Sequence, residues 1–143
     1  MYLVDMDFSE KRLTIENIHV AVGISIFYLT VLRLIYKAFN PTPKLNNSIF
    51  PGQKIIAKLN HVFLYISILM ITISGALKKL YNGEELDMFF FNLEIQDNFD
   101  LAEIFYEIHI LGNYTLIALI SLHIFAVLIH KILFKENLLK KIL

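Results

Sequence analysis

The stretch IHILGNYTLIALISLHIFAVLIH (residues 108–130) contains no aspartate, glutamate, lysine or arginine. An α-helix rises about 1.5 Å per residue, so this stretch is long enough to cross the roughly 30 Å hydrocarbon layer of a bilayer. A helix of a soluble bundle would carry charged residues about every 3.6 positions, and this stretch carries none. We therefore predict a membrane-spanning helix here.

Two earlier stretches have the same character. Residues 59–77 are free of formal charge, and residues 18–39 are apolar until Arg33 and Lys37 near their end. Hydrophobic residues make up 57% of the chain, above the share of about half that globular proteins show. The expected fold class is all-α, an integral membrane bundle of three transmembrane helices.

Charge and cysteine content exclude several classes of function. The chain has no net charge, so nucleic acid is not expected as a partner, and the lipid bilayer is. It has no cysteine, which excludes disulfides, iron–sulfur clusters and thiolate zinc sites.

The basic residues are distributed unevenly over the predicted loops, and cytoplasmic loops carry the excess of lysine and arginine. Eight lie in or beside the first loop and the C-terminal tail: Lys37, Lys44, Lys54, Lys58, Lys131, Lys135, Lys140 and Lys141. Four lie in the other two segments: Lys11, Arg12, Lys78 and Lys79. We predict an outer-face N-terminal segment (residues 1–17) and a transmembrane domain (residues 18–143) whose C-terminus is in the cytoplasm.

The histidines carry the candidate chemistry. All five lie within or at the ends of the predicted spans: His19, His61, His109, His123 and His130. A polar side chain at membrane depth is costly, so each of them needs a partner. His109 and His123 are about 40° apart around the third span and about 21 Å apart along it. This is the geometry of two haems stacked across a bilayer, whereas zinc ligands on one helix would be four residues apart.

His19 and His109 are each the second residue of a predicted span, and these two spans run in the same direction. We expect their imidazoles to lie at the same depth near the outer face, as axial ligands of one low-spin haem iron. Gly23 and Gly112 follow them on the ligand faces and are expected to leave room for the macrocycle. The alternative is that both histidines are interhelical hydrogen-bond partners or interfacial residues.

His61 and His130 are predicted to be interfacial residues at the cytoplasmic side, with proton transfer beside a quinone as the alternative. His123 is seven residues, about 10 Å, deeper than His130, which argues against His61 as the partner of His123. Arg33 is expected either to extend to the lipid headgroups or to bind a haem propionate.

Much of the chain resembles the bacterial cytochrome b561 family, whose fold is a four-helix bundle with two b haems. The stretches that resemble its second, third and fourth helices are NIHVAVGIS (residues 17–25), HVFLY (61–65) and residues 109–130. The resemblance implies an outer haem b bound at the positions of His19 and His109. It implies an inner haem b bound at the position of His123 and at a histidine of the first helix.

No stretch before His19 resembles that first helix, so we expect the second haem site to be half-built. Its missing ligand would come from a separately encoded helix or a second copy of the chain, or the site would be lost. The prediction is one haem for this chain alone.

The resemblance further implies a cytochrome of the bacterial inner membrane that passes electrons through haem to or from the quinone pool, with superoxide as one donor known in the family. Both an electron carrier and a quinone-linked oxidoreductase fit these features. The alternatives are a cytochrome b subunit that anchors a dehydrogenase or hydrogenase, and a degenerate fragment that holds no haem.

Overall fold

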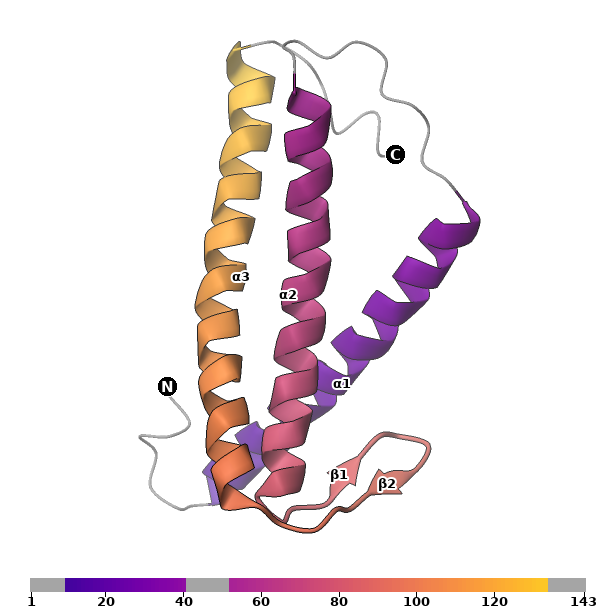
Figure 1. Ribbon diagram of the computed structural model, residues 1–143, viewed down its shortest axis with the longest axis vertical. Helices are drawn as coiled ribbons and strands as arrows, with labels where there is room; N and C mark the ends of the chain where they lie inside the picture. The colour runs from indigo at the N-terminus through magenta and orange to yellow at the C-terminus, as the bar shows by residue number, and fades with distance from the viewer. Residues whose placement is uncertain (1–9, 41–51, 134–143) are drawn as a thin grey trace.

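The computed structural model describes residues 10–40 and 52–133, which form three long helices and one short β-hairpin (Figure 1). The elements are α1 (Glu10–Phe39), α2 (Gln53–Tyr81), β1 (Leu86–Asp87), β2 (Asn92–Leu93) and α3 (Phe99–Leu133). All three helices contain a span long and apolar enough to cross a membrane. The expected all-α membrane bundle is therefore confirmed.

Some predictions fall outside the described residues. These are the predictions for residues 1–9, for the first-loop lysine Lys44, and for the tail lysines Lys135, Lys140 and Lys141. The side chains of Lys54, His130 and Lys131 are likewise outside the described part.

The helices begin earlier than the apolar stretches that predicted them. α1 begins at Glu10 and α3 at Phe99, whereas the predicted spans begin at residues 18 and 108. The start of α3 is set by Asn98, whose Oδ1 accepts a hydrogen bond from the backbone N–H of Leu101 at 3.1 Å. Asp100 in the first turn adds a favourable interaction with the helix dipole. The first turns of α3 therefore extend the helix beyond its most apolar part.

α2 and α3 run antiparallel and lie side by side along their length, whereas α1 crosses them near the hairpin and then diverges (Figure 1). Gly112 of α3 lies at the closest approach, because a Cβ there would come within 2.7 Å of Cγ1 of Ile71. Small residues of this kind let membrane helices pack closely. Helix packing thus fixes the relative position of α2 and α3.

The hairpin is wedged between α1 and α2 at one end of the bundle. Leu86 of β1, 1% exposed, packs with Ile24 of α1 and Leu80 of α2 in the one cluster of buried apolar residues within the described part. Tyr28 of α1 donates a hydrogen bond from its hydroxyl to the carbonyl of Met88 at 3.1 Å. Beyond this wedge α1 is free to diverge from α2 (Figure 1).

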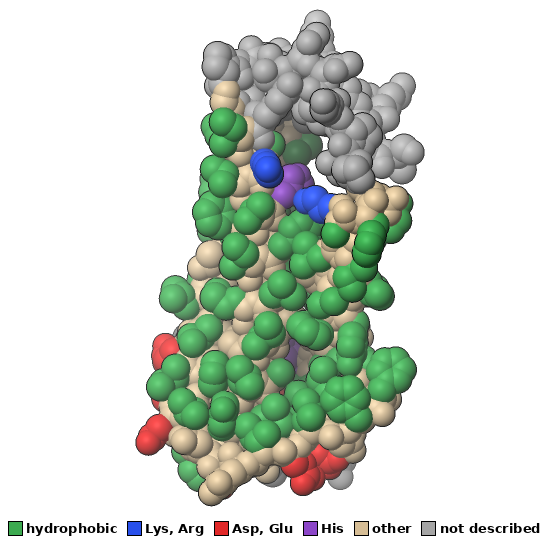
Figure 2. Space-filling model, turned by 45° about the vertical axis from the view of Figure 1, so that its right-hand side comes forward, with side chains coloured by type: hydrophobic (Ala, Val, Ile, Leu, Met, Phe, Trp, Pro, Cys, Tyr) green, Lys and Arg blue, Asp and Glu red, His purple; other side chains and the backbone are tan. Residues whose placement is uncertain are grey.

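The outer surface is apolar over most of its height, as a bilayer requires (Figure 2). Leu29, Leu111 and Leu122 are each more than 60% exposed. Acidic side chains gather at the hairpin end, and basic side chains lie beside a histidine toward the opposite end (Figure 2). The molecule is therefore an apolar bundle with oppositely charged ends.

Candidate functional site

His19 of α1 and His109 of α3 meet at the hairpin end of the bundle. Their ring centroids are 6.0 Å apart and their planes are inclined by 80°. The match in depth expected from the spacing of the spans is therefore present in the structure. α1 and α3 carry these rings to the same level because both helices run away from the hairpin end (Figure 1).

Two contacts from α2 fix the ring of His109. Its Nδ1 lies 2.9 Å from the carbonyl oxygen of Ile71. A carbonyl only accepts, so Nδ1 carries the proton and Nε2 keeps its lone pair. Gly75 lies against the ring, because a Cβ there would be 3.0 Å from both Nδ1 and Cε1. A backbone acceptor that fixes the tautomer in this way is typical of metal-binding histidines.

The distance between the two rings fits a metal ion between them. A metal–imidazole bond is about 2 Å long, so two imidazoles on opposite sides of one ion have ring centres roughly 6 Å apart. The observed 6.0 Å between His19 and His109 meets this requirement. The pair and the free Nε2 of His109 are thus suited to an iron with two axial histidines.

The two glycines expected beside this site differ. No heavy atom lies within 4 Å of a Cβ built at Gly23, so its face of α1 is open. Gly112 does not face open space, and the expectation that it leaves room for a macrocycle is wrong. Three residues after His109, it lies on the side of α3 that packs against Ile71 and Met70 of α2.

His61 and His123 form a second pair toward the other end of the bundle. Their ring centroids are 5.3 Å apart and their planes are inclined by 63°. The prediction that a mismatch in depth separates them is wrong. It measured depth from the ends of the apolar stretches, whereas the antiparallel packing of α2 and α3 decides. Gly75 lies opposite His109, and fourteen residues farther from the hairpin on both helices His61 lies opposite His123.

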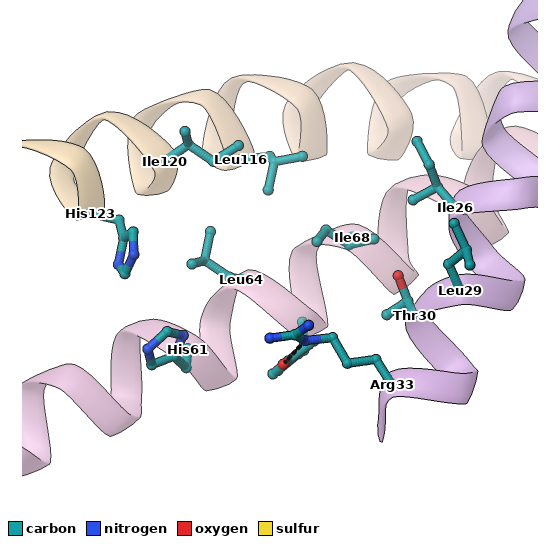
Figure 3. A pocket seen from close by; sticks show the side chains of 11 residues that line it. Ile26, Leu29, Thr30, Arg33, His61, Leu64, Ile68, Leu116, Ile120 and His123 are labelled. Carbon is teal, nitrogen blue, oxygen red and sulfur yellow. Dashed lines mark hydrogen bonds between the residues drawn. The ribbon is translucent and has the colours of Figure 1, made fainter. Parts of the chain in front are cut away.

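A cavity of about 430 Å³ lies beside this second pair, between all three helices (Figure 3). The side chains of His61, His123 and Arg33 extend toward the same space (Figure 3). Its wall is otherwise aliphatic, apart from Thr30 and Tyr65. The cavity therefore has an apolar body and a polar side rich in nitrogen.

Three polar contacts surround the cavity. Arg33 Nε donates to the hydroxyl oxygen of Tyr65 at 3.0 Å. The amide nitrogen of Asn60 lies 2.8 Å from Nδ1 of His123. Lys37 Nζ lies 5.0 Å from the centre of the Tyr65 ring. Arg33 thus belongs to the second level of the bundle, fourteen residues and about 21 Å along α1 from His19.

Sequence reasoning missed four contributors to these sites. Ile71 acts through its backbone carbonyl, which has no signature in the sequence. Gly75 and Asn60 face the ligand histidines only because of the α2–α3 packing. Tyr65, four residues after His61 on α2, had a detectable signal, because this spacing puts both side chains on one helix face.

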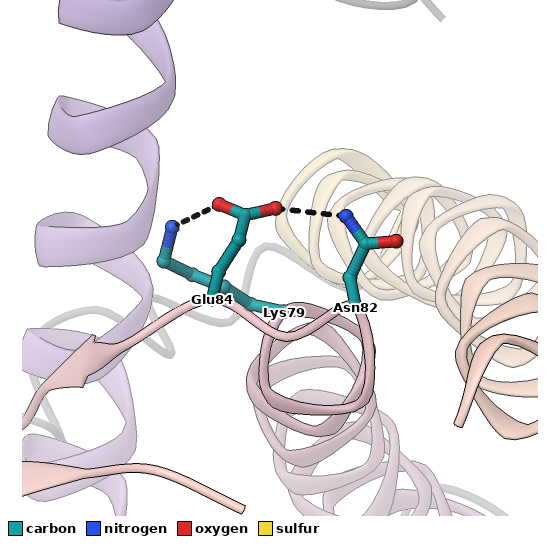
Figure 4. A network of polar contacts seen from close by, with 3 residues as sticks. All are labelled: Lys79, Asn82 and Glu84. Carbon is teal, nitrogen blue, oxygen red and sulfur yellow. Dashed lines mark hydrogen bonds and ion pairs between the residues drawn. The ribbon is translucent and has the colours of Figure 1, made fainter. Parts of the chain in front are cut away.

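A third polar group lies at the turn that leaves α2 (Figure 4). Lys79 Nζ pairs with Glu84 Oε2 at 2.6 Å, and Asn82 Nδ2 donates to Glu84 Oε1 at 2.9 Å. Partial burial raises the pKa of Glu84, but the hydrogen bonds from Lys79 and Asn82 and the charges of Lys79 and Lys78 outweigh it. The net effect lowers that pKa. The group fixes the start of the hairpin and carries no redox chemistry.

Comparison with known proteins follows from these sites. A family model described as prokaryotic cytochrome b561 matches residues 2–143. The protein "Cytochrome b561 homolog 2" of Escherichia coli (strain K12) is 26% identical over 130 residues, which are 89% of this chain and 69% of that protein. The family match includes both histidine pairs.

Proposed function

Because this chain belongs to the prokaryotic cytochrome b561 family, we propose that it binds one haem b between His19 and His109 and exchanges electrons with the quinone pool. Family membership and the three apolar helices make it a bacterial membrane protein, a b-type cytochrome of electron transfer. The axial ligands, the single haem and the quinone are the parts that we add.

The arrangement of His19 and His109 carries this proposal. Their rings are 6.0 Å apart, and the carbonyl of Ile71 holds the proton of His109 on Nδ1. Nε2 of His109 is then available as a ligand, and the open face at Gly23 provides space beside His19. When bound, the haem iron would supply one-electron redox chemistry. The chain supplies the ligands, their orientation and an apolar surrounding.

The donor is proposed to approach the hairpin end, which the lysine distribution assigns to the outer face. Superoxide is the donor that the family resemblance suggests. Its negative charge is unfavourable here, because eight carboxylates lie between residues 84 and 107 at this end. A neutral or cationic donor fits the charge of this end better.

The haem proposal is tested by difference spectra of purified protein, reduced minus oxidised. His19→Ala and His109→Ala should each abolish the low-spin b-type bands, since each removes an axial ligand. His61→Ala is the matched control and should keep most of the absorbance. A wild-type spectrum in both His19→Ala and His109→Ala would show that the iron is bound elsewhere.

A further inference from the structure

Two cations beside the cavity have no acidic partner in the described residues. Arg33 donates to the neutral hydroxyl of Tyr65, and Lys37 lies over the ring of the same residue. The carboxylates of the described part lie elsewhere, in the first turns of α1 or between residues 84 and 107 near the hairpin. The second level of the bundle therefore has positive charge without its counterion.

This charge lies within a membrane-spanning helix, where it is costly unless it is paired. Arg33 is six residues from the end of α1, about 9 Å along the helix, and its side chain is exposed. Its Nε is bonded to Tyr65, so the four N–H groups of its two terminal nitrogens remain available. That fork matches the oxygens of a phosphate or carboxylate.

The remainder of the cavity suits a hydrocarbon chain. Its aliphatic wall consists of Ile26, Leu29, Leu64, Ile68, Leu116 and Ile120. Its volume of about 430 Å³ is within the range of roughly 300–1,000 Å³ that small-molecule pockets show. Because α1 diverges from α2 and α3, a lipid chain can enter from the side (Figure 1).

We propose that this cavity binds an anionic phospholipid, whose phosphate pairs with Arg33 and Lys37 while an acyl chain lies along the aliphatic wall. Basic pockets between transmembrane helices on the cytoplasmic side bind such head groups, and the lysine distribution assigns this end to the cytoplasm. The site is separate from the haem proposed at His19 and His109 and does not depend on it.

A propionate of a second haem on His123 would offer the same anionic chemistry. Two observations disfavour it. The amide nitrogen of Asn60 can only donate, so Nδ1 of His123 accepts and its Nε2 carries the proton. The 5.3 Å between the rings of His61 and His123 is also shorter than the roughly 6 Å that an iron between them requires. A phospholipid is therefore the better occupant.

Native mass spectrometry of the haem-loaded full chain in detergent tests the site. Phosphatidylglycerol and phosphatidylcholine with the same acyl chains are the probes, and phosphatidylglycerol should remain bound preferentially. Arg33→Gln and Lys37→Gln should each weaken its binding about fivefold, the contribution of one cation near a charged lipid. Arg33→Lys should retain most of the binding. Lys78→Gln, the same loss of charge at the hairpin end, is the control and should change nothing.

Three results would overturn the proposal. The first is equal retention of the two lipids. The second is a loss of phosphatidylglycerol in Lys78→Gln that matches the loss in Lys37→Gln. The third is a pyridine haemochromogen assay that gives two haems per chain, with one lost in His123→Ala, because a propionate would then occupy the cavity. If Arg33→Gln does not fold, Lys37→Gln decides alone, since that side chain lies on the outside of the Tyr65 ring.

Discussion

His109 has one ring nitrogen committed to a backbone carbonyl and its edge pressed against a glycine, so little freedom remains in its orientation. The sequence predicted that His109 and His19 would lie at one depth, because helical rise converts residue spacing into height. It could not predict the contacts that orient the ring. The carbonyl of Ile71 is common to every residue, and Gly75 looks like any other small residue of a membrane helix.

Gly75→Val should displace the ring of His109. A Cβ at this position already lies 3.0 Å from the ring, and overpacking of this kind typically costs about 1–3 kcal/mol. We expect weaker or shifted low-spin haem bands in the difference spectrum of the purified variant. Ala118→Val on the exposed face of α3 is the control. Equal spectra for both variants would mean that Gly75 does not constrain the ligand.

Glu84 should make stability depend on pH below its ordinary pKa of 4.5, because its pKa in the folded protein is lower. Its contribution is complete above that ordinary value and disappears as the pH falls through the folded value. The side chain is 38% exposed, so the effect should stay below about 1 kcal/mol. Thermal unfolding between pH 7 and pH 3 should show less pH dependence in Glu84→Gln than in Glu94→Gln, an exposed control. The same dependence in both would exclude this role.

At the scale of elements, the packing of α2 against α3 brings together residues that hydropathy kept apart. Apolar stretches locate the middle of a membrane helix well, and all three were found. They do not give its ends, because the first turns of α3 are capped by Asn98 and contain Asp100. The error in the ends became an error in depth, which is why His61 and His123 were expected not to meet.

Leu86→Ala should loosen α1 from the rest of the bundle. Leu86 is 1% exposed and packs between Ile24 and Leu80, and such truncations typically cost about 2–5 kcal/mol. The thermal midpoint should fall clearly, and haem should dissociate more readily because His19 lies on α1. Leu93→Ala, its partner across the hairpin and 37% exposed, is the matched control. Equal midpoints for the two variants would show that the wedge contributes little.

At the scale of the whole molecule, the two ends differ in charge and in chemistry. The hairpin end has the acidic residues and the pair suited to iron, and the other end has the cations and the cavity (Figure 2). The sequence predicted this separation through its lysine distribution. The cavity itself could not be predicted, because it depends on the tilt of α1, which the hairpin wedge sets.

The orientation of the molecule stays a prediction and is readily tested. The chain has no cysteine, so single cysteines at Gln96 and Asn47 can be labelled without background. An impermeant maleimide added to intact spheroplasts should label the cysteine of Gln96→Cys, since the hairpin end is assigned to the outer face. It should label that of Asn47→Cys only after lysis. The opposite pattern would reverse the orientation and move the cavity to the outer leaflet.

The divergence of α1 also makes the two levels respond differently to bilayer thickness. Beyond the hairpin, the described polar links from α1 to α2 are those of Arg33 and Lys37 to Tyr65. A membrane helix adjusts to a thicker bilayer by becoming more upright. Since α1 is held at the hairpin, such a change would narrow the cavity and leave His19 beside His109. A single hinge would then keep the redox centre constant in membranes that vary in their lipids.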